Sequence, residues 1–167
     1  GTGIPVTFLR RKVLSCDSFL QVKTLIKDVK RSVSCNFMVA SAGGFALDLE
    51  AHPGGADILE PLNGILTHAN HFVRYPERNA LETSPRGERL RVLLEKRAGH
   101  IDVPWIKQCL GDHENYPKAI CRHPSDVLLP LRRRSITVAS VIYDLESGAA
   151  HICAGPPCEG EFFVTQI

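Results

Sequence analysis

The arrangement of short apolar runs limits the fold of this chain more than any other feature. Apolar runs separated by glycine-containing turns predict two antiparallel hairpins, formed by residues 37–40 with 45–49 and by residues 136–145 with 149–153. Another apolar run predicts a last strand at residues 162–167. Stretches with apolar residues at helical spacing lie apart from these hairpins in the sequence. Hairpins segregated from helices are typical of a layered α+β domain.

Four helices are expected from capping signals and apolar spacing. They are predicted at residues 5–14, after Asp17 or Ser18, from Ser84 to about Arg97, and in a short stretch after Asp102. Ser18 and Gln21 have the spacing of a capping box. Residues 52–64 and 112–134 are predicted to be irregular, and the length of the second segment favours a functional or docking role.

The composition is that of a globular domain, with 44% hydrophobic and 23% charged residues among 167. A net charge of +2 gives no reason to expect a nucleic-acid or membrane partner. The six cysteines have mostly apolar neighbours and no paired CxxC spacing, so we expect reduced thiols in an intracellular, cytoplasmic protein. Cys153 and Cys158 flank a Gly-Pro-Pro turn and form the alternative, a disulfide pair.

The segment from Gly64 to Phe72 combines an apolar run with a polar cluster. Ile65 and Leu66 predict a buried strand, and Thr67, His68, Asn70 and His71 would lie at its end. Buried amides and imidazoles destabilise a protein unless they are hydrogen-bonded. The cluster is therefore either a satisfied structural network or a site.

Three motifs in order along the chain carry a family resemblance. They are His68-Ala69-Asn70-His71, the stretch from Asn115 to Arg122, and Val141-Ile142-Tyr143-Asp144. Together they resemble the acyl-coenzyme A:6-aminopenicillanic acid acyltransferase family, the isopenicillin-N acyltransferase-like enzymes. The resemblance implies an αββα four-layer sandwich of the N-terminal-nucleophile type. It also implies a precursor that cleaves itself, so that a new N-terminal cysteine becomes the nucleophile and forms a thioester.

The resemblance assigns roles to two residues of the first motif. Asn70 would be a catalytic donor to the oxyanion of the tetrahedral intermediate, because a side-chain amide is neutral and rigidly placed. The alternative is a strand-end asparagine that hydrogen-bonds to its own backbone. We place His68 with the substrate-binding residues, and we expect His68 and His71 to support the site rather than to act directly.

The resemblance also implies roles for three arginines. Arg86, at the start of the third helix, would be a catalytic residue close to the nucleophile, where a cation favours a thiolate; the alternative is a surface ion pair with Glu82 or Glu88. By the resemblance, Arg122 would bind a substrate carboxylate, for which the guanidinium has the matching geometry, and Arg134 would be a second substrate-binding arginine near the pocket. Arg133 stands where the penicillin enzyme has a small polar residue, which makes penicillin itself an unlikely fit for the pocket.

No cofactor and no metal are predicted, and acyl-CoA enters only as a substrate class. His68 and His71 with Cys121 and His123 suggest zinc by residue type, but the CxxC and HExxH patterns are absent. Cys121 is expected to be an inert buried thiol.

The chain starts at Gly1 without the cysteine that the family uses, so residues 1–167 are interpreted as the C-terminal part of a single N-terminal-nucleophile domain. A preceding segment or subunit would supply the nucleophile. The predicted function is that of an amidohydrolase or acyltransferase, part of a self-processing enzyme acting on a C–N amide or acyl-CoA. Hydrolysis of a small N-acyl amino compound without CoA is a second reading. The non-enzymatic rival is a partner or scaffold module that keeps the fold.

Overall fold

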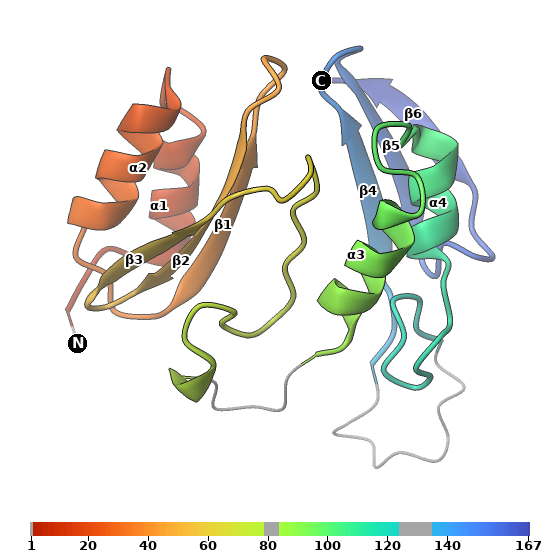
Figure 1. Cartoon of the computed structure of the whole chain (residues 1–167). Helices are drawn as coiled ribbons and strands as arrows, with labels where there is room; N and C mark the ends of the chain where they lie inside the picture. The colour runs from red at the N-terminus through yellow and green to blue at the C-terminus, as the bar shows by residue number, and fades with distance from the viewer. Residues whose placement is uncertain (1, 79–83, 124–134) are drawn as a thin grey trace. The chain divides into compact units, whose positions relative to one another are not determined.

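The computed structural model describes residues 2–78, 84–123 and 135–167. These residues form an α+β protein with two small antiparallel sheets and four helices, which confirms the α+β part of the prediction. The main elements are α1 (Val6–Val13), α2 (Phe19–Asp28), β1 (Cys35–Ala40), β2 (Ala46–His52), β3 (Gly55–Leu59), α3 (Arg86–Glu95), α4 (Val103–Leu110), β4 (Ala139–Asp144), β5 (Ala149–Ala154) and β6 (Phe162–Gln166) (Figure 1). The chain divides into a first unit, Gly1–Leu62 with His71–Leu81, and a second unit, Asn63–Asn70 with Glu82–Ile167.

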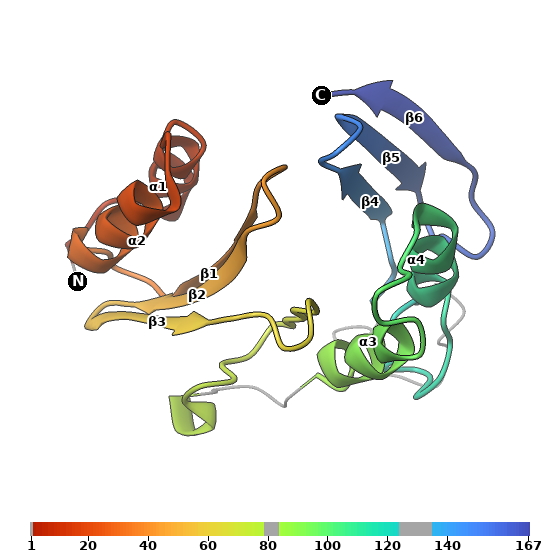
Figure 2. The ribbon, with the colours of Figure 1, turned by 45° about the horizontal axis from the view of Figure 1, so that its top comes forward.

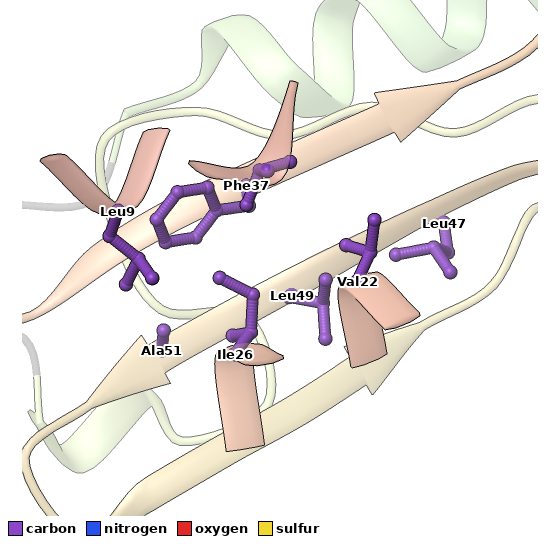
Figure 3. Packing of buried hydrophobic residues seen from close by; sticks show 8 residues of the cluster. Leu9, Val22, Ile26, Phe37, Leu47, Leu49 and Ala51 are labelled. Atoms are coloured by element: carbon purple, nitrogen blue, oxygen red, sulfur yellow. The ribbon is translucent and has the colours of Figure 1, made fainter. Parts of the chain in front are cut away.

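The first unit is one antiparallel sheet covered on one face by two helices. Strands β1, β2 and β3 pair in that order, and α1 and α2 lie on the same face of the sheet (Figure 2). The period of two along β1 and β2 points their apolar residues at these helices. The buried core consists of Leu9, Val13, Val22, Ile26, Phe37, Leu47, Leu49 and Ala51, most of them labelled in Figure 3.

The start of α2 is fixed by the predicted capping box. The Ser18 hydroxyl accepts a hydrogen bond from the Gln21 amide nitrogen at 3.3 Å. The Gln21 side chain accepts one from the Asp17 amide nitrogen at 2.8 Å, one residue earlier than the usual pattern. One backbone donor that the helix leaves unpaired at its first turn, the Gln21 N–H, thus gains a side-chain partner.

Replacing the cap should destabilise the protein measurably. We expect Ser18→Ala to lower the free energy of unfolding by about 0.5–2 kcal/mol, because the first turn of α2 loses its acceptor. Chemical denaturation of the purified protein measures the change. Ser34→Ala, at an exposed serine outside any helix, is the matched control. Equal losses in the two variants would contradict a capping role for Ser18.

The second unit also combines a three-stranded antiparallel sheet with two helices. Strands β4, β5 and β6 form an antiparallel sheet, and α4 packs on β4 while α3 packs on α4. Asp102 caps α4 as predicted, accepting a hydrogen bond from the Trp105 amide nitrogen at 2.8 Å. The Arg97 guanidinium lies 4.3 Å from the centre of the Trp105 ring, which links the end of α3 to the start of α4.

Two sequence predictions of local structure are wrong. The expected loop at residues 52–64 contains β3, which pairs with β2 through a tight turn at Pro53-Gly54. The expected strand after Gly64 does not form: Ile65 is buried, but residues 66–69 lie in no helix or strand. A strand exists through hydrogen bonds to a neighbour, which an apolar run alone does not reveal. The polar cluster therefore lies along an irregular segment.

The remaining elements agree with expectation. The third helix ends at Glu95, slightly earlier than predicted, and the segment after α4 is irregular as far as it is described. Within the described residues, no helix combines the length and the apolar character that a membrane crossing requires.

Candidate functional site

A pocket of about 570 Å³ lies within the second unit. Its lining includes four of the five residues predicted for the site: His68, Asn70, Arg86 and Arg122. His68 and Asn70 belong to the irregular segment after Ile65, and Arg86 is the first residue of α3. Arg122 belongs to the connection between α4 and β4. Arg134, the fifth, lies outside the described residues, so its assignment stays a prediction.

The first turn of α3 and the segment that carries His68 and Asn70 approach each other closely at a glycine. A Cβ atom placed on Gly87 would lie 3.4 Å from the Ala69 Cβ and 3.5 Å from the Ala69 nitrogen. A methyl group at this position would therefore be in ordinary van der Waals contact with Ala69, and a longer side chain would have less room. Next to this close approach, Asn70 and Arg86, which are distant in sequence, line the same pocket.

The pocket is electropositive because two guanidinium groups line it. Burial lowers the pKa of Arg86 below its ordinary value, and the positive charge of Arg122 lowers it further. Arg86 Nε donates a hydrogen bond to the Ser84 hydroxyl at 2.9 Å. Within the described residues, neither Arg86 nor Arg122 forms an ion pair with a carboxylate. Of the alternative surface ion pairs of Arg86, the one with Glu88 is not formed, since Glu88 pairs with Arg91. The other partner, Glu82, lies outside the described residues. An anionic group would relieve the repulsion between the two arginines.

Arg122 is held in place by residues that the sequence analysis missed. Its Nη1 donates to the Ser135 hydroxyl at 2.6 Å, and its backbone nitrogen donates to Thr137 Oγ1 at 3.0 Å. Its Nε donates to the Ala119 carbonyl at 3.3 Å. Ser135 and Thr137 also line the pocket. Their spacing of two residues before an apolar strand was the available signal, since alternate residues of an extended chain share a face.

Arg89 and His71 are close in sequence to the predicted site residues but do not line the pocket. Arg89 makes a bidentate pair with Asp112, at 3.0 and 2.6 Å, and a second ion pair with Glu114 at 2.8 Å. The hydrogen bond from Arg89 holds the pKa of Asp112 below its usual range. These contacts tie α3 to the segment that follows α4. His71 belongs to the first unit and does not line the pocket.

Cys121 is fully buried, and burial raises the pKa of its thiol to about 11. In the absence of a metal ion it therefore has little thiolate at neutral pH. All six cysteines are free, so the alternative disulfide between Cys153 and Cys158 does not form. Cys121 and His123 do contact further ligand-type side chains, but these are His113 and Cys158 and not the histidines of the first motif.

A comparison with protein-family models gives a match. The family model described as Acyl-coenzyme A:6-aminopenicillanic acid acyl-transferase matches residues 1–159 of the chain. A search of curated proteins found no match. The matched region contains every described residue that lines the pocket.

Proposed function

The chain belongs to the acyl-coenzyme A:6-aminopenicillanic acid acyltransferase family, and we propose that it is part of a self-processing N-terminal-nucleophile enzyme that transfers an acyl group through a thioester. The observation that carries this proposal is the pocket that brings His68, Asn70, Arg86 and Arg122 together. Family membership supports acyl-transfer chemistry, and the pocket supports a place for it within this chain.

In the proposed reaction, a cysteine at the start of a mature subunit attacks the carbonyl carbon of an amide or thioester. That cysteine belongs to a segment or subunit preceding this chain. The cysteine's own α-amine takes the thiol proton, since its unperturbed pKa is close to neutral pH. The Asn70 amide donates a hydrogen bond to the oxyanion that forms. Collapse of the intermediate releases the amine or thiol with that proton and leaves an acyl-cysteine thioester. Water or an amine then takes up the acyl group.

The pocket lining supports a substrate that combines an anionic group with an apolar part. Arg122, with the charge of Arg86 close to it, would bind a carboxylate, and His68 lines the same pocket. Leu90, Leu110 and Ile120 supply apolar surface in the same pocket. N-acyl amino acids fit this description, and acyl-CoA would satisfy the arginines through phosphate. Both hydrolysis and transfer to an amine use the same thioester.

The four-layer αββα sandwich is the architecture that we propose for the complete domain. Each unit of this chain has a helical layer on one face of an antiparallel sheet, which are the layers that this fold uses (Figure 2). In the second unit, Val141, Tyr143 and Phe163 are exposed apolar side chains of the sheet. Exposed apolar side chains on a sheet favour a further layer in the complete domain.

The test is to isolate the complete gene product and to determine the masses of its mature subunits. We expect one subunit that begins with cysteine, and an acyl adduct on that subunit during turnover that hydroxylamine removes. A protein without a cysteine-initiated subunit and without such an adduct would instead be the non-catalytic partner or scaffold module. If the adduct forms from amides but not from acyl-CoA, the activity is hydrolysis of amides.

A further inference from the structure

Two imidazoles and two thiols converge in the second unit, outside the pocket. The ligand atoms of His113, Cys121, His123 and Cys158 all lie within 4.8 Å of one another. The first three belong to the segment after α4, and Cys158 belongs to the connection between β5 and β6. Figure 1 shows this connection beside the end of α4, where a Cβ atom on Gly111 would lie 3.6 Å from the Cys158 Cβ.

Four of the six ligand-to-ligand distances in this cluster are close to the edges of a metal-centred tetrahedron. With Zn–S near 2.3 Å and Zn–N near 2.05 Å, the S–S, S–N and N–N edges are about 3.8, 3.6 and 3.4 Å. The two sulfur atoms lie 3.6 Å apart, and the two Nε2 atoms lie 2.9 Å apart. His123 Nε2 lies 3.7 Å from Cys121 Sγ and 3.1 Å from Cys158 Sγ. Each of these separations is within about 0.5 Å of the corresponding edge.

His123 has the partner that a metal-binding histidine usually has. Its Nε2 faces the cluster, while its Nδ1 lies 3.3 Å from the Glu159 carboxylate. A carboxylate on the second ring nitrogen fixes the ring orientation and the tautomer in which Nε2 is free to bind a metal. This contact is independent of the four ligands and points to the same use of the cluster.

We propose that His113, Cys121, His123 and Cys158 bind a zinc ion. Two thiolates with two imidazoles in tetrahedral geometry favour zinc among the common metals. Four protein ligands leave no open coordination position, so the site is structural rather than catalytic. The sequence analysis predicted no metal site, because Cys158 comes from a different connection and forms no CxxC pattern with Cys121.

A zinc ion here would also affect the pocket. Cys121 and His123 are the two neighbours of Arg122, whose side chain lines the pocket. Binding both of them to an ion that also holds Cys158 would fix the backbone on each side of Arg122. The metal would therefore position the arginine without touching the substrate.

Two other uses of the cluster make different predictions. Cys158 is exposed, and with His123 and Glu159 it resembles a reactive thiol with a base and an orienting acid. Alternatively, the two thiols would form a disulfide under oxidising conditions. Neither alternative uses His113, which lies 2.9 Å from His123.

The first experiment measures metal in the full protein, purified under reducing conditions without a metal-binding tag. Elemental analysis should give about one zinc ion per chain, because a closed four-ligand site binds a single ion. Cys158→Ser and His113→Ala should reduce this content to background. Cys16→Ser and His100→Ala, which alter a cysteine and a histidine outside the cluster, should leave it unchanged.

The second experiment begins with wild-type protein, so its first readout does not depend on a variant that folds. Wild-type protein refilled with Co²⁺ should show the absorption of tetrahedral cobalt with thiolate ligands, and added Zn²⁺ should remove it. Glu159→Ala should weaken zinc affinity about tenfold in competition with a chromophoric chelator, as loss of such a carboxylate typically does. Zinc should protect Cys158 from alkylation.

Three results would overturn the proposal. One is wild-type protein that binds neither Zn²⁺ nor Co²⁺ at stoichiometric levels. Another is a Cys121–Cys158 disulfide in protein isolated without reductant. The third is rapid alkylation of Cys158 that saturating zinc does not slow, which would favour the reactive thiol.

Discussion

Asn70→Ala in the complete enzyme should lower kcat by roughly 10²–10³, the usual loss when one oxyanion donor is removed. The expectation rests on the place of Asn70 in the pocket beside Arg86 and His68. KM should change little, because the hydrogen bond is made mainly in the transition state. Asn70 is exposed, so thermal stability should stay near that of the wild type. Steady-state kinetics and a melting curve give the two readouts.

The controls for Asn70 separate the amide donor from its surroundings. Asn70→Asp keeps the size but removes the N–H donor, so it should lose as much activity as alanine. Asn63→Gly alters another asparagine of the second unit, at a φ of 52° that glycine adopts without strain. It should leave kcat unchanged. Activity of Asn70→Ala within threefold of the wild type would make Asn70 a structural residue.

Arg122→Ala should raise KM for a carboxylate-bearing substrate by about 10–100-fold, the effect of losing a charged hydrogen-bonded pair. The value of kcat should fall less, because the contact is remote from the bond that breaks. Arg122→Lys should restore only part of the affinity, since an ammonium cannot make the two-pronged pair. An esterified or amidated substrate should no longer distinguish the wild type from the variant.

A second arginine on the same unit is the control for this effect. Arg91 lies on α3, where it pairs with Glu88 and Glu95. Arg91→Ala should leave KM unchanged for charged and uncharged substrates. If Arg122→Ala fails equally on both substrates, Arg122 acts through its bonds to Ser135 and Ala119 and holds its segment together.

The parts of the fold that the sequence predicted well depend on neighbours in the chain. Ser18 and Asp102 cap helices through residues three positions away, and the two hairpins turn at glycines close to their strands. Strand β3 was missed because its identity depends on pairing with β2, and its composition resembles a loop. The segment after Gly64 was assigned to a strand on apolar character alone, although ladder partners decide that state.

The candidate site also contains some residues that the sequence predicted and others that only the structure reveals. His68, Asn70, Arg86 and Arg122 were selected through family motifs, and the fold brings them to one pocket, while their roles remain predictions. Gly87, Ser135 and Thr137 contribute through contacts that only the folded chain reveals. His113 and Cys158 are distant in sequence, so no local spacing could pair them.

At Gly87, substitutions chosen to stabilise α3 can change the shape of the pocket. Within a helix, alanine is favoured over glycine by about 1 kcal/mol, and a methyl group here would just reach van der Waals contact with Ala69. Any longer side chain has to turn away from Ala69 or displace it, and Asn70 is the next residue. A search for stabilising substitutions guided by helix propensity would therefore choose this position early, and any choice larger than alanine would change the geometry of the pocket.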